Sequence, residues 1–250
     1  MSKKYWISIP AAGLSAIFMI GCGSGSGSYT PTKAKTIEVK AIQPGDEAKI
    51  WPATEGNAWT YEVQTQTAAN GQVKRDDADI TFKISKVEKN GNATVFTIDA
   101  ARAGDPAGQQ KWHHDDKGIY QMWVNKPEQL FSPMQPAILF PIKAGQEFDY
   151  EGTGPTIIGV IGKFSMKNKV LAPQIVDTAQ GPISGFGVES YGTFTANDPK
   201  AGAVTGTVRT TAYWAPGIGL IRYTQTAVAN AKAGQLQAMQ SLKLKNYVVK

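Results

Sequence analysis

Residues 51–62 read WPATEGNAWTYE, and residues 140–151 read FPIKAGQEFDYE. Both stretches place Pro after an aromatic residue, then a Gly, then an aromatic residue and a Tyr at alternate positions before a Glu. Pro cannot donate to a strand ladder and Gly tolerates positive φ, so each stretch predicts a turn that leads into a strand. The alternating aromatic residues would share one face of that strand. The repeat therefore predicts a scaffold element, a turn that begins an amphipathic strand, and contains no nucleophile or metal cage.

The segments that follow both stretches alternate apolar and polar residues, as in DITFKIS at 79–85. Alternation of this kind is typical of an antiparallel sheet with one wet face. Asn90-Gly91 predicts a two-residue hairpin turn. KPEQLF at 126–131 predicts a short helix, since Pro127 suits a first helical position. We therefore expect an all-β fold, a curved antiparallel sheet or incomplete barrel of about ten strands with few short helices.

The similarity between the two parts of the chain continues beyond the repeated stretch. KWHHDDKGIYQMW at 111–123 and AYWAPGIGLIRY at 212–223 each predict an aromatic strand, a tight turn and a second strand. These similarities indicate two loosely repeated halves, residues 51–135 and 140–250. Recurrent use of one hairpin design is the alternative explanation.

The beginning of the chain is basic at MSKK and then apolar as far as MIGC at 19–22. This order is typical of a secretory signal. The apolar run is at the lower limit of membrane-spanning length and is interrupted by Pro10 and Gly13, so a retained transmembrane helix is the less favoured alternative. The expected organisation is a signal peptide over 1–21, a lipidated Cys and flexible tether over 22–35, and a single β-rich domain over 36–250.

MIGC resembles a bacterial lipobox, with Met19 in the place where Leu is favoured. The resemblance implies that Cys22 carries acyl chains such as palmitate and becomes the mature N-terminus. Cys22 is the only Cys, so it cannot form an internal disulfide. Gly23 lies where an Asp would resemble an inner-membrane retention signal. The resemblance therefore implies a lipid anchor in the cell envelope, in the outer membrane, with the domain facing the periplasm or the cell surface.

FPIKAGQEFDYEG and YWAPGIGLIRYTQT together resemble the motifs of a group of poorly characterised bacterial lipoproteins. Ile142, Phe148 and Ile221 stand where that group has Leu, Trp and Val. More distantly, these motifs resemble envelope lipoproteins built like the lipoprotein carriers of the outer membrane. That resemblance implies an incomplete barrel around an apolar cavity, although the chain lacks the long helices that cover the cavity of such carriers.

WHHDD at 112–116 holds both His residues of the chain. Adjacent strand residues point to opposite faces, so His113 and His114 cannot both reach an ion shared with Asp115. A hairpin turn at DDKG is the alternative, since these residue types favour turns. His113, His114 and Asp115 are nevertheless the candidate metal ligands. An envelope-bound hydrolase or metal-dependent enzyme centred on His113 and His114 is the alternative function.

The chain shows neither a nucleophile elbow nor a dinucleotide fingerprint, so we expect a non-enzymatic protein without a cofactor. The net charge of +6 is not gathered into a patch with stacking aromatic residues, which argues against a nucleic-acid partner. The expected function is binding of an apolar ligand, such as a lipid, or of an envelope protein. An assembly subunit that pairs by its sheet edge is a further alternative. The candidate ligand-groove residues are Trp59, Tyr61, Phe148, Tyr150, Tyr213 and Trp214.

Overall fold

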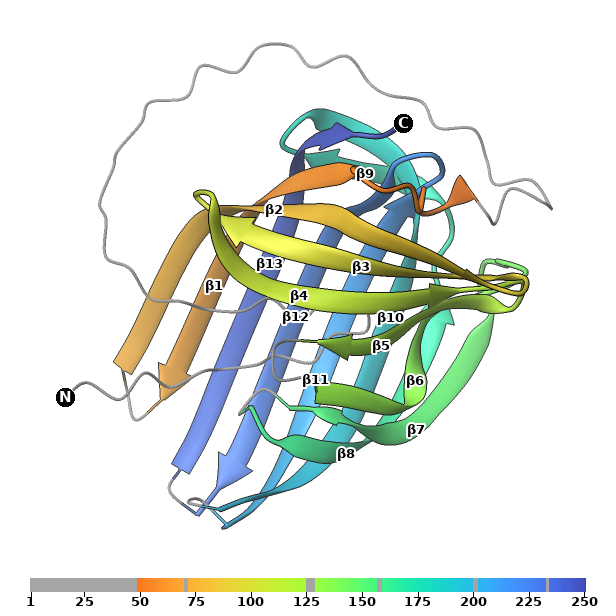
Figure 1. Ribbon diagram of the computed structural model, residues 1–250. Coiled ribbons are helices and arrows are strands. Elements are labelled where there is room, and N and C mark those ends of the chain that lie inside the picture. The colour runs from red at the N-terminus through yellow and green to blue at the C-terminus, as the bar shows by residue number, and fades with distance from the viewer. Residues whose placement is uncertain (1–48, 70–71, 125–128, 157–158, 200–201, 233) are drawn as a thin grey trace.

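The structure, a computed structural model, describes residues 49–69, 72–124, 129–156, 159–199, 202–232 and 234–250 (Figure 1). Thirteen strands form one antiparallel sheet in these residues. The strands are β1 (Ala58–Ala69), β2 (Gln72–Asn90), β3 (Ala93–Arg102), β4 (Asp105–His114), β5 (Gly118–Val124), β6 (Gln129–Leu139), β7 (Glu147–Pro155), β8 (Ile161–Val170), β9 (Gln174–Thr178), β10 (Gly181–Asp198), β11 (Gly202–Ala215), β12 (Gly219–Ala231) and β13 (Gly234–Val248).

Twelve of the strands close into a barrel. The sheet order is β11-β12-β13-β1-β2-β3-β4-β5-β6-β7-β8-β10-β9, and β10 also pairs with β11. Because β10 has 18 residues, its first part pairs with β9 and its later part pairs with both β8 and β11. The prediction of an antiparallel all-β fold is confirmed, but the barrel is closed where an incomplete one was expected. The strands number thirteen where about ten were expected.

Two local predictions need correction. Gln129–Phe131, the end of the predicted short helix at 126–131, form the beginning of strand β6, and the described residues contain no helix. Accordingly, no helix within the described ranges is long and apolar enough to cross a membrane. The hairpin predicted at Asn90-Gly91 joins β2 and β3, but Asn90 pairs with Ala93, so the two loop residues are Gly91 and Asn92. Cys22 and the boundaries predicted at residues 21 and 35 lie outside the described residues.

The two copies of the repeated stretch form the same turn. Gly56 has a φ of 88° and Gly145 a φ of 81°, which confirms the predicted positive values. The amide of Gly56 donates to the carbonyl of Ile84 on β2 at 2.9 Å, and the amide of Gly145 donates to the carbonyl of Val170 on β8 at 2.8 Å. Each turn therefore fixes the beginning of one strand, β1 or β7, against the strand that follows it.

Each half of the sequence supplies six strands to the barrel, β1 to β6 from the first and β7, β8 and β10 to β13 from the second. Counted along the barrel, the fourth and fifth strands of each half form a hairpin. This hairpin is β4–β5 in the first half and β11–β12 in the second. Trp112 and Trp214 lie on these hairpins, are fully buried, and directly follow a register shift in both cases. The arrangement of the halves is thus regular, while their origin by duplication stays a prediction.

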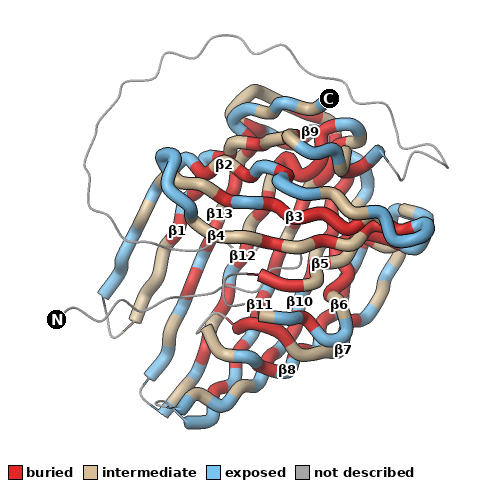
Figure 2. The backbone as a smooth tube through the Cα atoms, in the orientation of Figure 1, coloured by how far each residue is buried: buried red, intermediate tan, exposed pale blue. Residues whose placement is uncertain are grey.

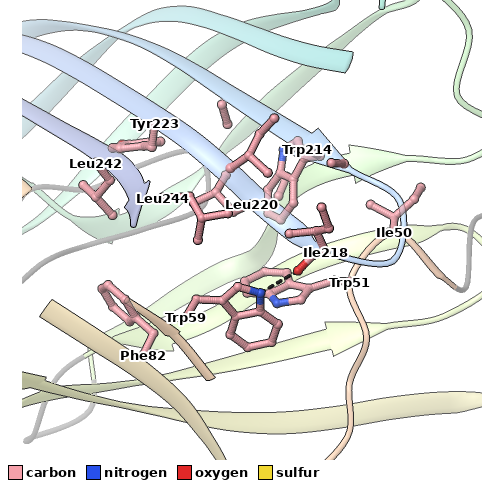
Figure 3. Packing of buried hydrophobic residues seen from close by; sticks show 14 of the residues in the cluster. Ile50, Trp51, Trp59, Phe82, Trp214, Ile218, Leu220, Tyr223, Leu242 and Leu244 are labelled. Atoms are coloured by element: carbon pink, nitrogen blue, oxygen red, sulfur yellow. Dashed lines mark hydrogen bonds between the residues drawn. The ribbon is translucent and has the colours of Figure 1, made fainter. Parts of the chain in front are cut away.

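Buried residues alternate with more exposed ones along many of the strands (Figure 2). Because successive strand residues point to opposite faces, the buried set faces the interior. A first cluster of apolar side chains fills the end of the barrel next to residues 49–57. Trp51 lies in this cluster, with Trp59 and Trp214 nearby (Figure 3). The segment at 49–51 is held there because the amide of Gly217 donates to the carbonyl of Lys49 at 2.7 Å.

The hairpin of β9 and β10 covers the same end of the barrel. Val176 on β9 and Ile183 on β10 are buried in the first cluster. The amide of Ala179 donates to the carbonyl of Leu244 on β13 at 2.8 Å, which fixes the hairpin across the barrel end. A second cluster lies further along the strands and consists of Tyr150, Phe164, Met166, Phe194, Val204, Val208, Ala227, Ala229 and Ala238.

Candidate functional site

A row of uncharged polar side chains crosses the inner face of the barrel between the two apolar clusters. It takes one residue from each of six neighbouring strands, and each residue is paired in register with the next. All six are at most 6% exposed. We name this row the polar belt, and its members are Thr65 of β1, Gln240 of β13, Gln225 of β12, Thr210 of β11, Ser190 of β10 and Asn168 of β8.

The two ends of the polar belt are hydrogen-bonded to the adjoining strands. The hydroxyl of Thr65 donates to the carbonyl of Asp76 on β2 at 3.0 Å. The side-chain amide of Asn168 donates to the carbonyl of Phe148 on β7 at 3.0 Å. These bonds satisfy the terminal members and hold the belt in place on the wall.

The middle of the polar belt differs from its ends. Ser190 Oγ, Thr210 Oγ1 and both side-chain amide atoms of Gln240 are buried and have no hydrogen-bond partner in the described part of the chain. Native proteins pair the great majority of buried polar atoms, so such a group calls for an explanation. These atoms face the barrel interior, where neighbouring side chains of the barrel cover them almost completely.

The wall beyond the polar belt is built from small side chains. On β12 and β13 the inward positions that follow the belt are Ala227, Ala229 and Ala238, all buried in the second cluster. An eight-stranded barrel is just wide enough for its side chains to fill, and diameter grows with strand number. Twelve strands make this barrel wider than an eight-stranded one, and side chains fill it at this point, since Ala227, Ala229 and Ala238 are at most 4% exposed.

Three predicted groove residues are buried and hydrogen-bonded to backbone carbonyls. Trp59 Nε1 donates to Ile218 at 2.5 Å, as Figure 3 shows, and the Tyr61 hydroxyl donates to Leu220 at 2.8 Å. Burial raises the pKa of Tyr61 above its ordinary value, so the phenol stays protonated and remains a donor. Burial likewise raises the pKa of Tyr150 to about 12, and its hydroxyl donates to a backbone carbonyl on β6 at 3.0 Å.

The structure does not gather the six predicted groove residues on one surface. Trp59, Tyr61 and Trp214 belong to the first cluster, and Tyr150 belongs to the second. Phe148 and Tyr213 are half-buried and pack against the first cluster. A ligand groove made of these residues stays a prediction, and it would require the packed end of the barrel to open.

The predicted hairpin turn at DDKG is confirmed between β4 and β5. Asp115 Oδ1 accepts hydrogen bonds from the amides of Lys117 at 2.9 Å and Gly118 at 3.0 Å. Asp115 Oδ2 lies 3.0 Å from Nε2 of His113. Although partial burial opposes it, these hydrogen bonds lower the pKa of the Asp115 carboxyl. Asp115 is thus held in its charged form by the turn itself.

His114 lies on the buried side of β4, while His113 is only half-buried. The ring of His114 packs on Phe140 with a centroid separation of 5.7 Å. Burial lowers the pKa of His114, which favours the neutral imidazole. Within the described ranges, no group of three or more His, Cys, Asp or Glu side chains is placed to hold a metal ion.

A hollow of about 680 Å³ lies on the outer face of β7, β8, β10 and β11. It was not predicted from the sequence, although Phe148 of the predicted groove is among its lining residues. Tyr191 is 56% exposed there. Acidic and basic side chains are equal in number around it, and Lys169 pairs with Glu147 at 3.0 Å. The outward lining residues are Glu147, Asp149, Lys167, Lys169, Glu189, Tyr191 and Arg209.

Comparison with known proteins gives two similar solved structures. No family model matches the sequence, and no curated protein matches it. One structure, from Parabacteroides distasonis ATCC 8503, is of a "putative lipoprotein" with 14% sequence identity and a TM-score of 0.47. The other, from Bacteroides fragilis NCTC 9343, is of a "putative exported protein with YmcC-like fold" with 14% identity and a TM-score of 0.45. Each alignment covers 80% of this chain and 98% of the other chain.

Proposed function

We propose that this protein is a lipid-anchored, extracytoplasmic protein of the cell envelope, which binds an apolar ligand inside its barrel and catalyses no reaction. The barrel interior is the observation that supports ligand binding most directly. A closed ring of strands encloses the apolar clusters, and its wall on β12 and β13 carries the small side chains of Ala227, Ala229 and Ala238, so an apolar ligand would take the place of side chains that fill the interior here. Concave sites lined mainly by apolar groups with a few placed polar groups are typical of small-molecule binding.

Anchoring is supported by the sequence at 19–22, which lies outside the described residues. Two or three acyl chains on Cys22 would bind the protein stably to a bilayer, at about 0.8 kcal/mol for each buried methylene. The Gly- and Ser-rich residues 23–28 would separate the anchor from the barrel. The barrel would then face the aqueous side of the membrane.

The contacts of the two His residues support a structural role over a catalytic one. His113 pairs with Asp115, whose other oxygen closes the turn between β4 and β5. His114 packs on Phe140 within the protein. The ring of His113 also packs on Tyr120 of β5 with a centroid separation of 5.8 Å, so both imidazoles make contacts that hold neighbouring segments together.

Replacing Cys22 with Ser is expected to move the protein from the membrane fraction to the soluble fraction and to abolish labelling by a palmitate analogue. The reason is that a Ser hydroxyl is not a substrate for thioether lipidation. The measurement is cell fractionation without detergent, together with in-cell labelling of the full chain. Ser24→Ala, two residues further on, is the control and should leave both results unchanged. Persistent membrane binding of the Cys22→Ser chain would show that the anchor lies elsewhere.

Ligand binding is tested on the full chain purified from its own membranes. Organic extraction followed by mass spectrometry is expected to release an apolar compound in an amount close to that of the protein. An equal mass of an unrelated lipoprotein, purified in parallel, controls for lipid carried over from the membrane. No enrichment over this control, together with no uptake of Nile red by the purified chain, would contradict the proposal and favour docking of an envelope protein at the outer hollow.

A further inference from the structure

We propose that the barrel opens at the junction of β6 and β7, and that the side chains of Tyr150 and Phe131 hold this junction closed. We name the junction the seam, which consists of residues 131–134 of β6 and 150–154 of β7. We name Tyr150 and Phe131 the latch. Such opening goes beyond the proposed function and does not depend on it, because it can be measured without a ligand. It would also admit an occupant to an interior that side chains fill in the closed barrel.

Backbone pairing is weakest at the seam. Among the described residues, Ser132 with Thr153 is the one register pair that joins β6 to β7. By contrast, β8 pairs with every residue of β7, and β13 pairs with every residue of β1. Of the two junctions between the halves of the sequence, β6–β7 and β13–β1, the seam is therefore the weaker.

The middle of β6 is also poorly paired on its other side. In the described chain, residues 131–134 have no register partner on β5, because the register shifts between Gln121 and Trp123. Pro133 lies within this stretch and has no amide hydrogen to donate. Segments that are held by few interactions open locally at a lower free-energy cost than the rest of a fold. We therefore expect residues 131–134 to separate from β7 before any other part of the ring opens.

Side-chain hydroxyls bind the seam where backbone pairing is sparse. The hydroxyl of Tyr150 on β7 donates to the carbonyl of Pro133 on β6 at 3.0 Å. The hydroxyl of Thr153 donates to the carbonyl of Ser132 at 3.4 Å. Because Tyr150 is only 4% exposed, its bond is the better protected of the two from competing water.

Two glycines of β7 make room for the latch. A Cβ atom on Gly152 would collide with the hydroxyl of Tyr150, and a Cβ atom on Gly154 would collide with the ring of Phe131. Phe131 extends from β6 and is 5% exposed, so its ring packs over β7 across the seam. Rotation of these two side chains would release the contacts without breaking the pairing of β7 with β8.

Hydrogen exchange measured by mass spectrometry tests the opening on the full chain carrying Cys22→Ser, which needs no detergent. Peptides that cover the seam are expected to exchange faster than those of β1 and β13. Tyr150→Phe should raise the exchange rate of the seam by about three- to ten-fold, the factor that corresponds to one hydrogen bond, and leave β1 and β13 unchanged. Tyr61→Phe is the matched control, since the Tyr61 hydroxyl also donates to a buried backbone carbonyl, and it should leave the seam unchanged.

A reversible cross-link tests the same opening independently of the latch. Ser132→Cys with Thr153→Cys places two thiols at the register pair of the seam, and Cys22→Ser removes the only other thiol. Oxidation should slow exchange of the seam at least about ten-fold, because the cross-link restrains the open state, and should abolish uptake of Nile red. Dithiothreitol should reverse both effects. Thr193→Cys with Thr207→Cys, an exposed pair between β10 and β11, is the control, and its oxidation should change neither.

Three results would overturn the inference: seam exchange no faster than that of β1 and β13, a seam rate unchanged by Tyr150→Phe, or Nile red uptake that survives oxidation of the seam pair. Failure of the proposed function gives a different pattern. A chain whose seam exchanges fast and responds to Tyr150→Phe, but which takes up no Nile red in any form, retains the seam and loses the ligand.

Discussion

Replacing Trp51 with Ala is expected to lower the free energy of unfolding by about 3–5 kcal/mol, the range found for a buried Trp or Phe replaced by Ala. Trp51 belongs to no strand, yet it is only 3% exposed. Its ring lies 4.8 Å from Trp112 and 5.0 Å from Trp214, one from each half of the barrel. Because it joins the two halves at the closed end, its loss leaves a cavity between strands that are remote in the sequence. Chemical denaturation followed by circular dichroism would measure the change.

Phe140→Ala is the matched control, since Phe140 holds the same place in the second copy of the repeated stretch. Phe140 is half-buried and packs against the edge of the first cluster. Its loss should therefore cost clearly less than the loss of Trp51. Equal costs for the two substitutions would contradict the view that Trp51, and not its counterpart Phe140, joins the two halves at this end of the barrel.

Replacing Gly192 with Ala is expected to destabilise the barrel by about 2–3 kcal/mol, as overpacking of a well-filled site commonly does. A Cβ atom on Gly192 would lie 2.2 Å from the carbonyl oxygen of Ser165 and 2.5 Å from Sδ of Met166. The Met side chain can rotate away. The Ser165 carbonyl belongs to β8, which pairs with β10, so it cannot move without disturbing the closure of the barrel. Thermal melting of the two proteins would measure the loss.

Gly91→Asn is the control, because it replaces a glycine at a position where the new side chain meets no other atom. Gly91 has a φ of 59°, and a Cβ there would meet no atom within 4 Å. Asn tolerates the left-handed region better than other residues with a side chain, so this change should cost only a small part of the Gly192 effect. A Gly192→Ala protein as stable as the parent would mean that β8 and β10 can separate without cost.

The turns of the repeated stretch could be predicted because their geometry is local. The positive φ values at Gly56 and Gly145 and the turn at Asp115 were predictable because each depends on residues a few positions apart. The predicted short helix failed at Gln129–Phe131, where pairing of β6 with β5 overrides a weak local preference.

The polar belt could not be predicted in the same way. A sequence hint exists in Tyr223, Gln225 and Ala227, where a Gln interrupts an apolar inward series on β12. One such Gln is unremarkable, since any strand can carry a polar residue at a buried position. The belt becomes visible only when the register of six strands places their polar residues side by side.

The sequence by itself determined that this protein consists of antiparallel strands begun by two equivalent turns, because side-chain alternation and glycine conformation are local properties. Only the tertiary structure decided that the sheet closes, that Trp51 fills one end, and that the polar belt lies inside. These features depend on β10 pairing with both β8 and β11, and on registers between strands far apart in the chain. Such registers follow from the packing of the whole ring, which no local pattern specifies.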